Sequence, residues 1–429
     1  MVISRKALKL IHHKLFFLLV ALLPVQLAFH FWPDWSTVFG IRVDYLSPTV
    51  YLTDIIVVGI LVSWVIGGLR GKRLDKLAFK KLSQPPFNYF LFAISYLLIT
   101  SIFIAQNPGA ALYKSAKILE FFFLGLYVFI NHQALRSKYL TLSLSVAIFY
   151  SSIIAWGQFL VGHSIGESLW WLGERTFSVS TPGIALVTIG GQDYLRPYAT
   201  FPHPNVLAGF LLVGIIFLLS GRRNFRFLTS ASIVLGILAI VISFSQAVWL
   251  ASMVLIIITL PIIRKRLTFL ANLILGLVIA GSIILPLLPT DTTQSLPQEI
   301  SQRIILAKAA GDMFLDYPLF GVGLNNFVVK LPQHISPATA WLLQPVHNLS
   351  LLILAETGLA GLIFLGWFLI KALKRFSNLS SQFPIALLAV LLTGFFDHYW
   401  LTLQQTQLLF VVVVALIFSK SRPANPTKL

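Results

Sequence analysis

The chain is organised around residues 290–361, which contain the turn Asp316-Tyr317-Pro318-Leu319-Phe320-Gly321-Val322-Gly323 and end in an apolar run that starts at Pro345-Val346-His347-Asn348-Leu349. They begin as the one long polar interruption in an otherwise apolar sequence. A helical pattern at Pro297–Leu315 leads to the turn, and Tyr317-Pro318 ends that pattern. Basic side chains, a glycine turn and an imidazole next to an apolar run together favour a site for an anionic substrate.

The composition indicates a membrane protein. Of the 429 residues 57% are hydrophobic, and the mean hydropathy is +0.86. A soluble domain of this composition would expose large apolar patches. The sequence has no cysteine, which excludes disulfides, thiolate metal sites and cysteine nucleophiles. The net charge of +18 comes in short clusters between apolar runs, as in cytoplasmic loops, and this pattern argues against a nucleic-acid partner.

The sequence predicts an all-α fold, a polytopic membrane helical bundle with about 12 transmembrane helices in a single integral membrane domain over residues 1–429. A span needs roughly 17 to 25 apolar residues. The basic start of the chain resembles a signal peptide, but no small-residue cleavage site follows, so we expect a retained first helix. The predicted spans lie near Leu15–Phe31, Val50–Leu69, Phe87–Ala105, Ser115–Ile130, Leu140–Val161, Val206–Ser220, Phe227–Phe244, Ala247–Ile263, Phe269–Leu288, Asn348–Ile370, Phe383–Phe396 and Gln407–Phe418.

The basic residues predict the orientation of the bundle. With the N-terminus inside, 24 of the 32 Lys and Arg residues fall on the inner side. The positive-inside bias then predicts a protein of the cytoplasmic membrane with both termini in the cytoplasm. Three outer segments are longer than a turn: Trp32–Thr49, Gly162–His203 and Leu288–Val346. The last, over residues 288–346, is the predicted large extracytoplasmic loop with short helices.

Arg196 precedes the proline-rich run Pro197–Asn205, which contains His203, at the start of the sixth predicted span. A cation that faces lipid costs about 2.5 to 3.5 kcal/mol at the bilayer centre, so Arg196 is expected to face a cavity or an anion. A snorkelling arginine at the interface is the alternative. Pro202 and Pro204 remove backbone donors, and such irregular backbone at membrane depth chiefly lines cavities.

Arg303 and Lys308 lie on the predicted loop helix. Lys308 is four residues before Asp312, so a solvated ion pair explains it most simply. Arg303 has no acidic residue three or four positions downstream, although Glu299 lies four upstream. A guanidinium suits phosphate oxygens, which makes Arg303 a candidate phosphate ligand.

His347 begins the tenth predicted span, where a membrane pocket would meet water. Its titration range suits a general acid or base, although an isolated histidine is more often structural. Asn348 and Glu356 are placed to orient other groups. Glu356 lies within the span, where an acid is either functional or part of a helix-packing hydrogen bond. Nucleotide-binding motifs are missing from the sequence, and we expect no metal and no cofactor.

Three segments resemble the O-antigen ligase and polymerase superfamily of multi-spanning membrane enzymes. They are Arg196–Leu207, Arg303 through Gly323, and His347-Asn348-x-x-Leu ending in Glu356-Thr357-Gly358-Leu359-Ala360-Gly361. One departure is visible. Family members often carry an arginine after a serine at the outer tip between the seventh and eighth spans, where this chain has Ser243-Phe244-Ser245-Gln246-Ala247. Gln246 can hydrogen-bond a phosphate or a sugar but cannot neutralise charge.

The resemblance implies an enzyme that transfers a glycan from a polyprenyl-diphosphate carrier, such as undecaprenyl diphosphate, to a hydroxyl of a glycan or glycolipid acceptor at the outer membrane face. Such chemistry assembles cell-surface polysaccharide, including lipopolysaccharide. The resemblance implies that Arg196 and Arg303 bind the diphosphate and that His347 removes the acceptor proton in a metal-independent, inverting transfer. An O-antigen-type polymerase with the same chemistry, a flippase or other transporter, and a non-catalytic scaffold are alternatives. Secondary candidates for the site are His203, Asn205, Gln246, Lys308, Asn348 and Glu356.

Overall fold

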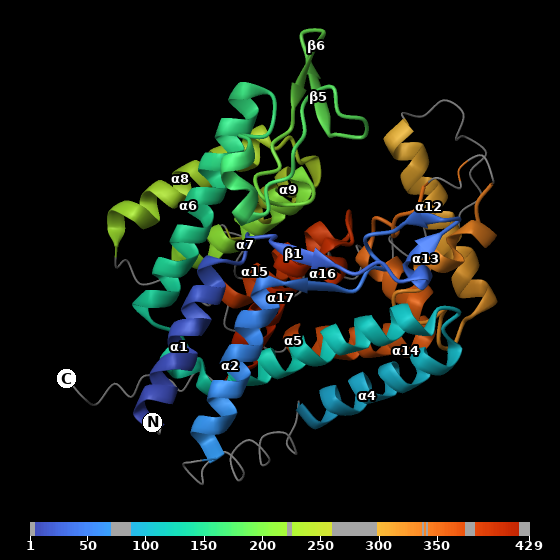
Figure 1. Cartoon of the computed structure of the whole chain (residues 1–429), viewed down its shortest axis with the longest axis horizontal. Coiled ribbons are helices and arrows are strands. Elements are labelled where there is room, and N and C mark those ends of the chain that lie inside the picture. Colours follow the sequence, from blue (N-terminus) through green and yellow to red (C-terminus); the bar gives the residue numbers. More distant parts are fainter. Residues whose placement is uncertain are drawn as a thin grey trace.

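The computed structural model describes residues 5–69, 87–220, 225–259, 298–336, 339, 342–373 and 382–419. Helices dominate this part of the chain (Figure 1). The longer ones are α1 (Arg5–Ala21), α2 (Leu52–Leu69), α4 (Phe87–Ile104), α5 (Pro108–Leu135), α6 (Lys138–Val161), α7 (Pro204–Ser220), α8 (Arg226–Ile242), α9 (Gln246–Thr259), α12 (Gln298–Asp316), α14 (Leu349–Leu373), α15 (Gln382–Gly394) and α17 (Gln404–Phe418). Short helical turns are η1 (Asp34–Ser36), η2 (Glu167–Leu172), α13 (Phe327–Lys330), η5 (Leu331–Gln333) and α16 (Tyr399–Thr402).

Four helices in the described part are long and apolar enough to cross a membrane, namely α2, α5, α6 and α14. The helices α7, α8, α9, α15 and α17 are apolar but shorter. These helices support a helical membrane protein, whereas the number of twelve spans stays a prediction. The predicted ninth span, Phe269–Leu288, lies outside the described residues.

The first predicted span, Leu15–Phe31, is wrong in its second half. Helix α1 ends at Ala21, and Ala28–His30 form strand β1 instead. Pro24 explains the difference, because proline lacks a backbone N–H and clashes with the preceding turn of a helix. By contrast, the helix expected at Pro297–Leu315 is confirmed as α12, which runs from Gln298 to Asp316.

The prediction of an all-α fold needs a correction, because short antiparallel strand pairs lie between the helices. The pairs are β1 (Ala28–His30) with β4 (Thr49–Tyr51), β2 (Thr37–Val38) with β3 (Ile41–Arg42), and β5 (Leu186–Ile189) with β6 (Gln192–Leu195). The β5–β6 hairpin turns at Gly190 and Gly191, whose φ values are 61° and 83°. A two-residue hairpin turn of this kind needs positive φ at both positions. This hairpin projects from the helical body (Figure 1).

Helix α7 lies at the centre of the larger hydrophobic core, and its residues from Val206 to Leu218 are buried. Helices α6, α8 and α15 pack around it. Glycines allow the closest approaches, since a Cβ at Gly209 would lie 2.2 Å from the Tyr399 hydroxyl oxygen. A second core joins α12, α13 and α14 with residues 38–46. Because α12 carries Arg303 and α14 follows His347, this second core fixes the relative positions of both.

A network of charged groups lies inside the bundle. Lys117 of α5 forms an ion pair with Asp54 of α2 and lies 3.4 Å from a carboxylate oxygen of Glu120. Gln404 of α17 donates a hydrogen bond to the other oxygen of Asp54. Pairing of this kind offsets much of the cost of burying charge in apolar surroundings. The network therefore joins α2, α5 and α17.

The turn of residues 317–323 docks backbone to backbone on α14. Two N–H groups of the turn donate to the carbonyls of Ala355 and Glu356, at 2.9 and 3.0 Å. Two N–H groups of α14 donate back to the carbonyls of Pro318 and Leu319, at 2.9 and 3.2 Å. Helix α14 is kinked at Gly358, with φ 60° and ψ −155°, and this kink frees the groups for the exchange. The glycine turn and the glycine-rich part of α14 thus form one contact through backbone hydrogen bonds, hereafter the joint.

Substitution of Gly321 with alanine is expected to lower the melting temperature of the protein. Gly321 has a φ of 70°, and a Cβ there would lie 2.4 Å from the backbone carbon of Glu356. Positive φ in a non-glycine residue costs about 1 to 3 kcal/mol, and the backbone clash adds to this cost. Thermal unfolding of the purified protein measures the shift.

Gly366→Ala is the matched control for this joint. Gly366 also lies on α14, but an added Cβ there meets no atom within 4 Å. Alanine has the higher helix propensity, so the control is expected to melt at or slightly above the wild-type temperature. Equal melting temperatures for Gly321→Ala and the wild type would contradict the interlocked joint.

Candidate functional site

The link between α15 and α16, residues 395–398, is the point where the predicted site residues meet. Arg303 Nη1, from α12, donates to the carbonyl of Phe396 at 2.8 Å. Asn348 Nδ2, just before α14, donates to the preceding carbonyl at 2.9 Å. Elements that are far apart in the sequence therefore hold one short segment. These two side chains bond to adjacent backbone carbonyls, and their roles at the site stay predictions.

Asp397 lies at the centre of the site. Its Oδ1 is 3.5 Å from His347 Nδ1 and 4.0 Å from His398 Nε2. Its Oδ2 accepts a hydrogen bond from Asn205 Nδ2 at 3.3 Å. His347 Nδ1 is buried and makes no hydrogen bond of ordinary geometry among the described residues, and Asp397 Oδ1 at 3.5 Å is the carboxylate oxygen that lies next to it. A proton on Nδ1, facing Asp397, leaves Nε2 of the same ring as the acceptor.

Exposure separates the three clustered side chains. The side chain of His347 is 21% exposed, against 9% for Asp397 and 4% for His398. Among these three, His347 is therefore the group that a substrate can reach. Asp397 lies behind it, in contact with the imidazole.

The electrostatics of Asp397 suit that position. Burial by itself raises the pKa of the Asp397 carboxyl, but its interactions with the neighbouring imidazoles, above all His347, outweigh burial and hold this pKa well below its usual range. Burial lowers the pKa of His398 to about 3, against the attraction of Asp397. His398 is therefore neutral at pH 7, and its Nδ1 lies 2.7 Å from Thr402 Oγ1. An ionised carboxylate next to an imidazole stabilises the imidazolium that forms when the ring accepts a proton.

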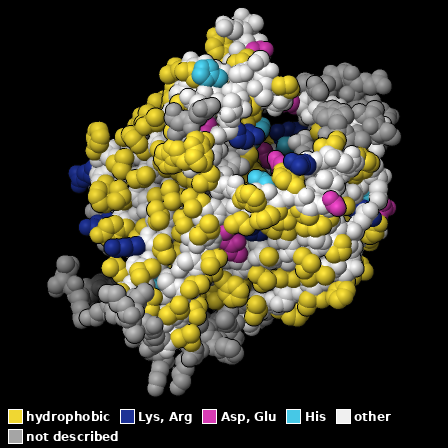
Figure 2. All heavy atoms as spheres, in the orientation of Figure 1, with side chains coloured by type: hydrophobic (Ala, Val, Ile, Leu, Met, Phe, Trp, Pro, Cys, Tyr) yellow, Lys and Arg dark blue, Asp and Glu magenta, His cyan; other side chains and the backbone are white. Residues whose placement is uncertain are grey.

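Arg196 joins the site through Asn205. Its Nη2 donates to Asn205 Oδ1 at 2.9 Å, and its Nε donates to the carbonyl of Ser243 at 2.8 Å. Burial lowers the pKa of Arg196, the Glu299 carboxylate opposes this shift, and the charge of Arg303 adds to it. A guanidinium stays charged in proteins despite such shifts. The two neighbouring cations, Arg196 and Arg303, therefore create positive potential at the site. Figure 2 shows a hollow in the surface in which basic, acidic and histidine side chains gather.

The backbone that follows Arg196 is held in an uncommon conformation. Ala199 has a φ of 49°, a value that non-glycine residues rarely adopt. Gln158, buried at the end of α6, accepts from the N–H groups of Tyr198 and Ala199 at 2.9 and 2.7 Å, and donates to the Ala199 carbonyl at 2.9 Å. Thr200 Oγ1 donates to the Pro24 carbonyl at 2.6 Å. The prolines predicted an irregular segment, but only the structure identifies the side chain that stabilises it.

The remaining sequence candidates have other surroundings. His203 Nδ1 accepts from the Asn205 N–H at 3.2 Å, and burial lowers the pKa of His203 to about 3, so the ring is neutral at pH 7. Glu356 accepts from the Phe327 N–H at 3.4 Å and belongs to the joint between the turn and α14. Gln246 begins α9 with an exposed side chain, three residues after the carbonyl that Arg196 contacts.

Lys308 lies on α12, the helix that also carries Arg303. Its ion pair with Asp312 stays a prediction. Asp312 is exposed, so that pair would be solvated.

Sequence reasoning missed Asp397 and His398. The predicted eleventh span stopped at Phe396, one residue before the acid. The available signal was an acid and an imidazole at the end of an apolar run, since ionisable residues at a membrane boundary are functional candidates. Nothing local in the sequence pairs Asp397 with His347, fifty residues earlier.

An apolar cavity of about 370 Å³ lies beside the site, between α4, α5, α14, α15 and α17. Tyr45, Pro345 and Thr402 line it near the histidines, and the Tyr45 ring is centred 5.6 Å from that of His398. Lys114 also lines the cavity, and its ammonium donates to the Leu401 carbonyl. A cavity of this lining suits a hydrocarbon chain, because burial of apolar surface is favourable and non-directional.

The described residues also offer one candidate metal group. One ligand atom from each of His347, Asp397 and His398 lies within 4.8 Å of the others. Zinc binds imidazole nitrogens at about 2.0 to 2.1 Å, so the three side chains would have to move closer together to share an ion. The same residues also suit proton transfer without a metal.

A family model matches the part of the sequence that carries Arg303 and His347. Residues 231–366 match the family model described as O-antigen ligase. The match includes Arg303, His347 and Glu356 and ends before Asp397. A search of curated proteins found no match. The family match supports a role in the assembly of cell-surface glycans.

Proposed function

We propose that this protein, a member of the O-antigen ligase superfamily by the domain at residues 231–366, transfers a glycan from a polyprenyl-diphosphate carrier to an acceptor hydroxyl. The observation that carries the proposal is the meeting of His347 and Asp397 with Arg196 and Arg303 beside an apolar cavity. This arrangement offers a base, two cations and a place for a lipid.

The donor needs compensation for its charge at one end and burial of its hydrocarbon at the other. Guanidinium groups suit diphosphate oxygens because they donate two parallel hydrogen bonds and stay charged. Arg196 and Arg303 now bond to an amide oxygen and to backbone carbonyls, which are neutral acceptors. A diphosphate would be a stronger, charged acceptor for both. The apolar cavity next to the histidines would receive the first part of the polyprenyl chain.

The reaction is a direct displacement. The acceptor hydroxyl gives its proton to His347 Nε2 as its oxygen bonds to the anomeric carbon of the donor sugar. The bond between that carbon and the diphosphate oxygen breaks, and the lipid diphosphate leaves with its negative charge met by the arginines. Asp397 holds the imidazole and stabilises the imidazolium. One displacement inverts the anomeric configuration, and no metal takes part.

The test is an assay of the purified protein with a polyprenyl-diphosphate glycan, with release of free lipid diphosphate as the readout. Release should need an acceptor and should persist in excess EDTA. Glycolipid acceptors and a second copy of the lipid-linked glycan form separate arms, because a ligase uses the first and a polymerase the second. If no acceptor supports release, or if EDTA abolishes release and Zn²⁺ restores it, the proposed metal-independent transfer is wrong.

The proposed location is the cytoplasmic membrane, with both termini inside and the site on the outer face. Gln192, at the tip of the β5–β6 hairpin, and Lys138, at the start of α6, are both exposed and on opposite sides in this orientation. The chain has no cysteine, so single-cysteine variants label cleanly. An impermeant thiol reagent should label Gln192→Cys in intact cells and Lys138→Cys only after lysis. The reverse pattern would place the site on the cytoplasmic side.

A further inference from the structure

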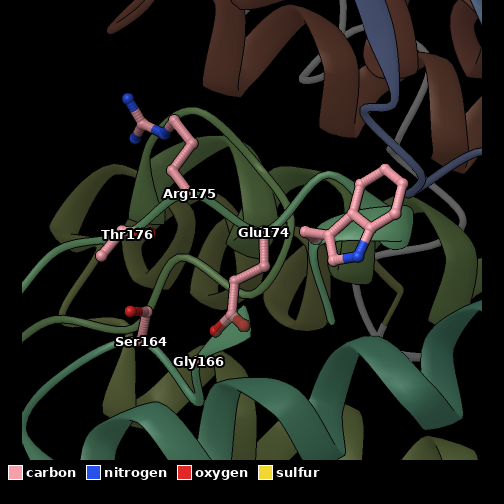
Figure 3. Close-up of a pocket in the computed structure, with 6 residues that line it drawn as sticks. Ser164, Gly166, Glu174, Arg175 and Thr176 are labelled. Atoms are coloured by element: carbon pink, nitrogen blue, oxygen red, sulfur yellow. The ribbon is translucent and has the colours of Figure 1, made fainter. Parts of the chain in front are cut away.

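A second pocket lies in the outer segment between α6 and α7. Its volume is about 420 Å³, within the usual range of ligand sites, and its lining residues are Ser164, Gly166, Trp170, Glu174, Arg175 and Thr176 (Figure 3). Two backbone segments form its frame. The Ser164 N–H donates to the Phe177 carbonyl at 2.9 Å, and the Phe177 N–H donates to Ser164 Oγ at 3.3 Å. The pocket is therefore formed without a ligand.

The two carboxylate oxygens of Glu174 differ in their hydrogen bonds. Its Oε1 accepts from Gln158 Nε2 and from the Ile165 N–H, both at 2.8 Å. Its Oε2 is buried and has no hydrogen-bond partner among the described residues. In Figure 3 the carboxylate points toward Ser164 and Gly166, whereas Arg175 points the other way. A buried carboxylate oxygen without a donor is costly, so this oxygen is poised to accept from a hydroxyl of a ligand.

Trp170 supplies the apolar part of the same pocket. The residue is 64% exposed, although it belongs to the helical turn η2. The negative face of an indole attracts the C–H groups on the face of a pyranose ring, while hydroxyls on the ring edge need acceptors such as a carboxylate. The pairing of Trp170 with Glu174 meets both needs. It favours an uncharged sugar, because an acidic sugar would be repelled by the carboxylate.

The pocket is joined to the proposed active site by direct contacts. Gln158, which bonds Glu174, also holds the backbone of Tyr198 and Ala199, next to Arg196 in sequence. Arg175 Nη2 donates to the Pro202 carbonyl at 2.8 Å, and its guanidinium lies 5.3 Å from the centre of the Tyr198 ring. The segment of residues 196–205 therefore contacts both the pocket and the proposed active site.

We propose that this pocket is a saccharide subsite that holds an uncharged pyranose unit of a glycan chain while another unit of that chain reacts. Trp170 stacks on the sugar ring and Glu174 accepts its hydroxyls. The subsite rests on the proposed glycan transfer for its biological role, but not for its ability to bind a sugar. The bound sugar unit can belong to the donor glycan or to the acceptor glycan, and the experiment distinguishes the two.

The first measurement is binding by saturation-transfer NMR with the full chain in nanodiscs. One arm uses the oligosaccharide that mild acid releases from the polyprenyl-diphosphate donor, and the other uses the delipidated acceptor oligosaccharide. The arm that binds identifies the source. Trp170→Ala and Glu174→Gln should each weaken that binding by about 3- to 10-fold. Trp171→Ala is the matched control, because Trp171 is also exposed and on the same turn but does not line the pocket.

The second measurement separates sugar binding from anchoring of the tryptophans in the membrane interface. The kcat/KM for a donor with a long glycan is divided by that for a donor with a single sugar. If the donor arm binds, this ratio should fall about 3- to 10-fold in Trp170→Ala and stay at the wild-type value in Trp171→Ala. For the acceptor arm the same ratio is taken between long and short acceptors. Equal effects of the two tryptophan substitutions, independent of glycan length, would show membrane anchoring and overturn the subsite.

The two proposals fail in different ways. If the wild type binds an oligosaccharide through Trp170 and Glu174 but releases no lipid diphosphate, the subsite is supported and the proposed transfer reaction is wrong. If the wild type is active and neither oligosaccharide binds, or if both pocket variants bind as tightly as the wild type, the subsite is wrong and the transfer reaction is unaffected.

Discussion

His347→Gln is expected to lose turnover by about 10²- to 10⁴-fold, the usual contribution of a positioned general base. Glutamine is close in size and can form a hydrogen bond, but it cannot accept the acceptor proton. Release of lipid diphosphate under saturating donor measures kcat, and binding of the donor measures whether the site survives. Binding should stay near the wild-type level, because Arg196 and Arg303 are unchanged.

Asp397→Asn tests the same base through its partner. Asparagine keeps the size of aspartate but loses the charge that stabilises the imidazolium, and its amide N–H favours the wrong tautomer of His347. We expect a loss of kcat of the same order as for His347→Gln and little change in donor KM. The double variant should be no worse than the worse single variant, because the two residues act as one unit.

His132→Gln is the control for both, because His132 lies at the end of α5, where its Nδ1 contacts the Phe129 carbonyl. Near-wild-type turnover by His347→Gln would falsify its role as the base. Fully additive losses in the double variant would instead separate Asp397 from His347 and favour a role in holding Asn205.

Arg303→Ala and Arg196→Ala are each expected to lower kcat/KM by roughly 10- to 100-fold, since hydrogen bonds to charged groups contribute about 1.5 to 3 kcal/mol. Both side chains would meet the negative charge that grows on the leaving diphosphate. Arg→Lys should recover only part of the loss, because lysine keeps the charge but not the two parallel donors. Kinetics with the lipid-diphosphate donor measure the effect.

Both arginines also bond to the protein, so stability must be measured alongside activity. Arg42→Ala is the control, because Arg42 is an exposed cation, 5.2 Å from the Trp32 ring. A purely structural role predicts that Arg303→Ala and Arg196→Ala lower the melting temperature and that activity follows the folded fraction. A diphosphate-binding role predicts lost activity in folded protein, and a return of activity in both lysine variants to the wild-type level would contradict the need for two parallel donors.

The comparison of prediction with structure shows which features are local. Helices α2, α6 and α12 agree with the predicted ranges within a few residues, because apolar runs and a stop at Pro318 act over one or two turns of helix. The prediction for Leu15–Phe31 was wrong because a count of apolar residues does not distinguish helix from strand after a proline. The strand pair β1–β4 joins segments about twenty residues apart, and the β2–β3 and β5–β6 hairpins are too short for an alternating pattern to be recognised.

For the site, the sequence by itself determined that this is a basic, apolar membrane chain with Arg196 and His347 next to apolar runs and Arg303 on a helix of the predicted outer loop, since charge and hydropathy are properties of single positions. The tertiary structure alone decided that Asp397 lies behind His347, that Gln158 holds the backbone after Arg196, and that Gly321 and Gly358 allow two backbones to touch. These contacts join residues about thirty-five to fifty positions apart. Their energies depend on distance and orientation between elements, which no local pattern of residues encodes.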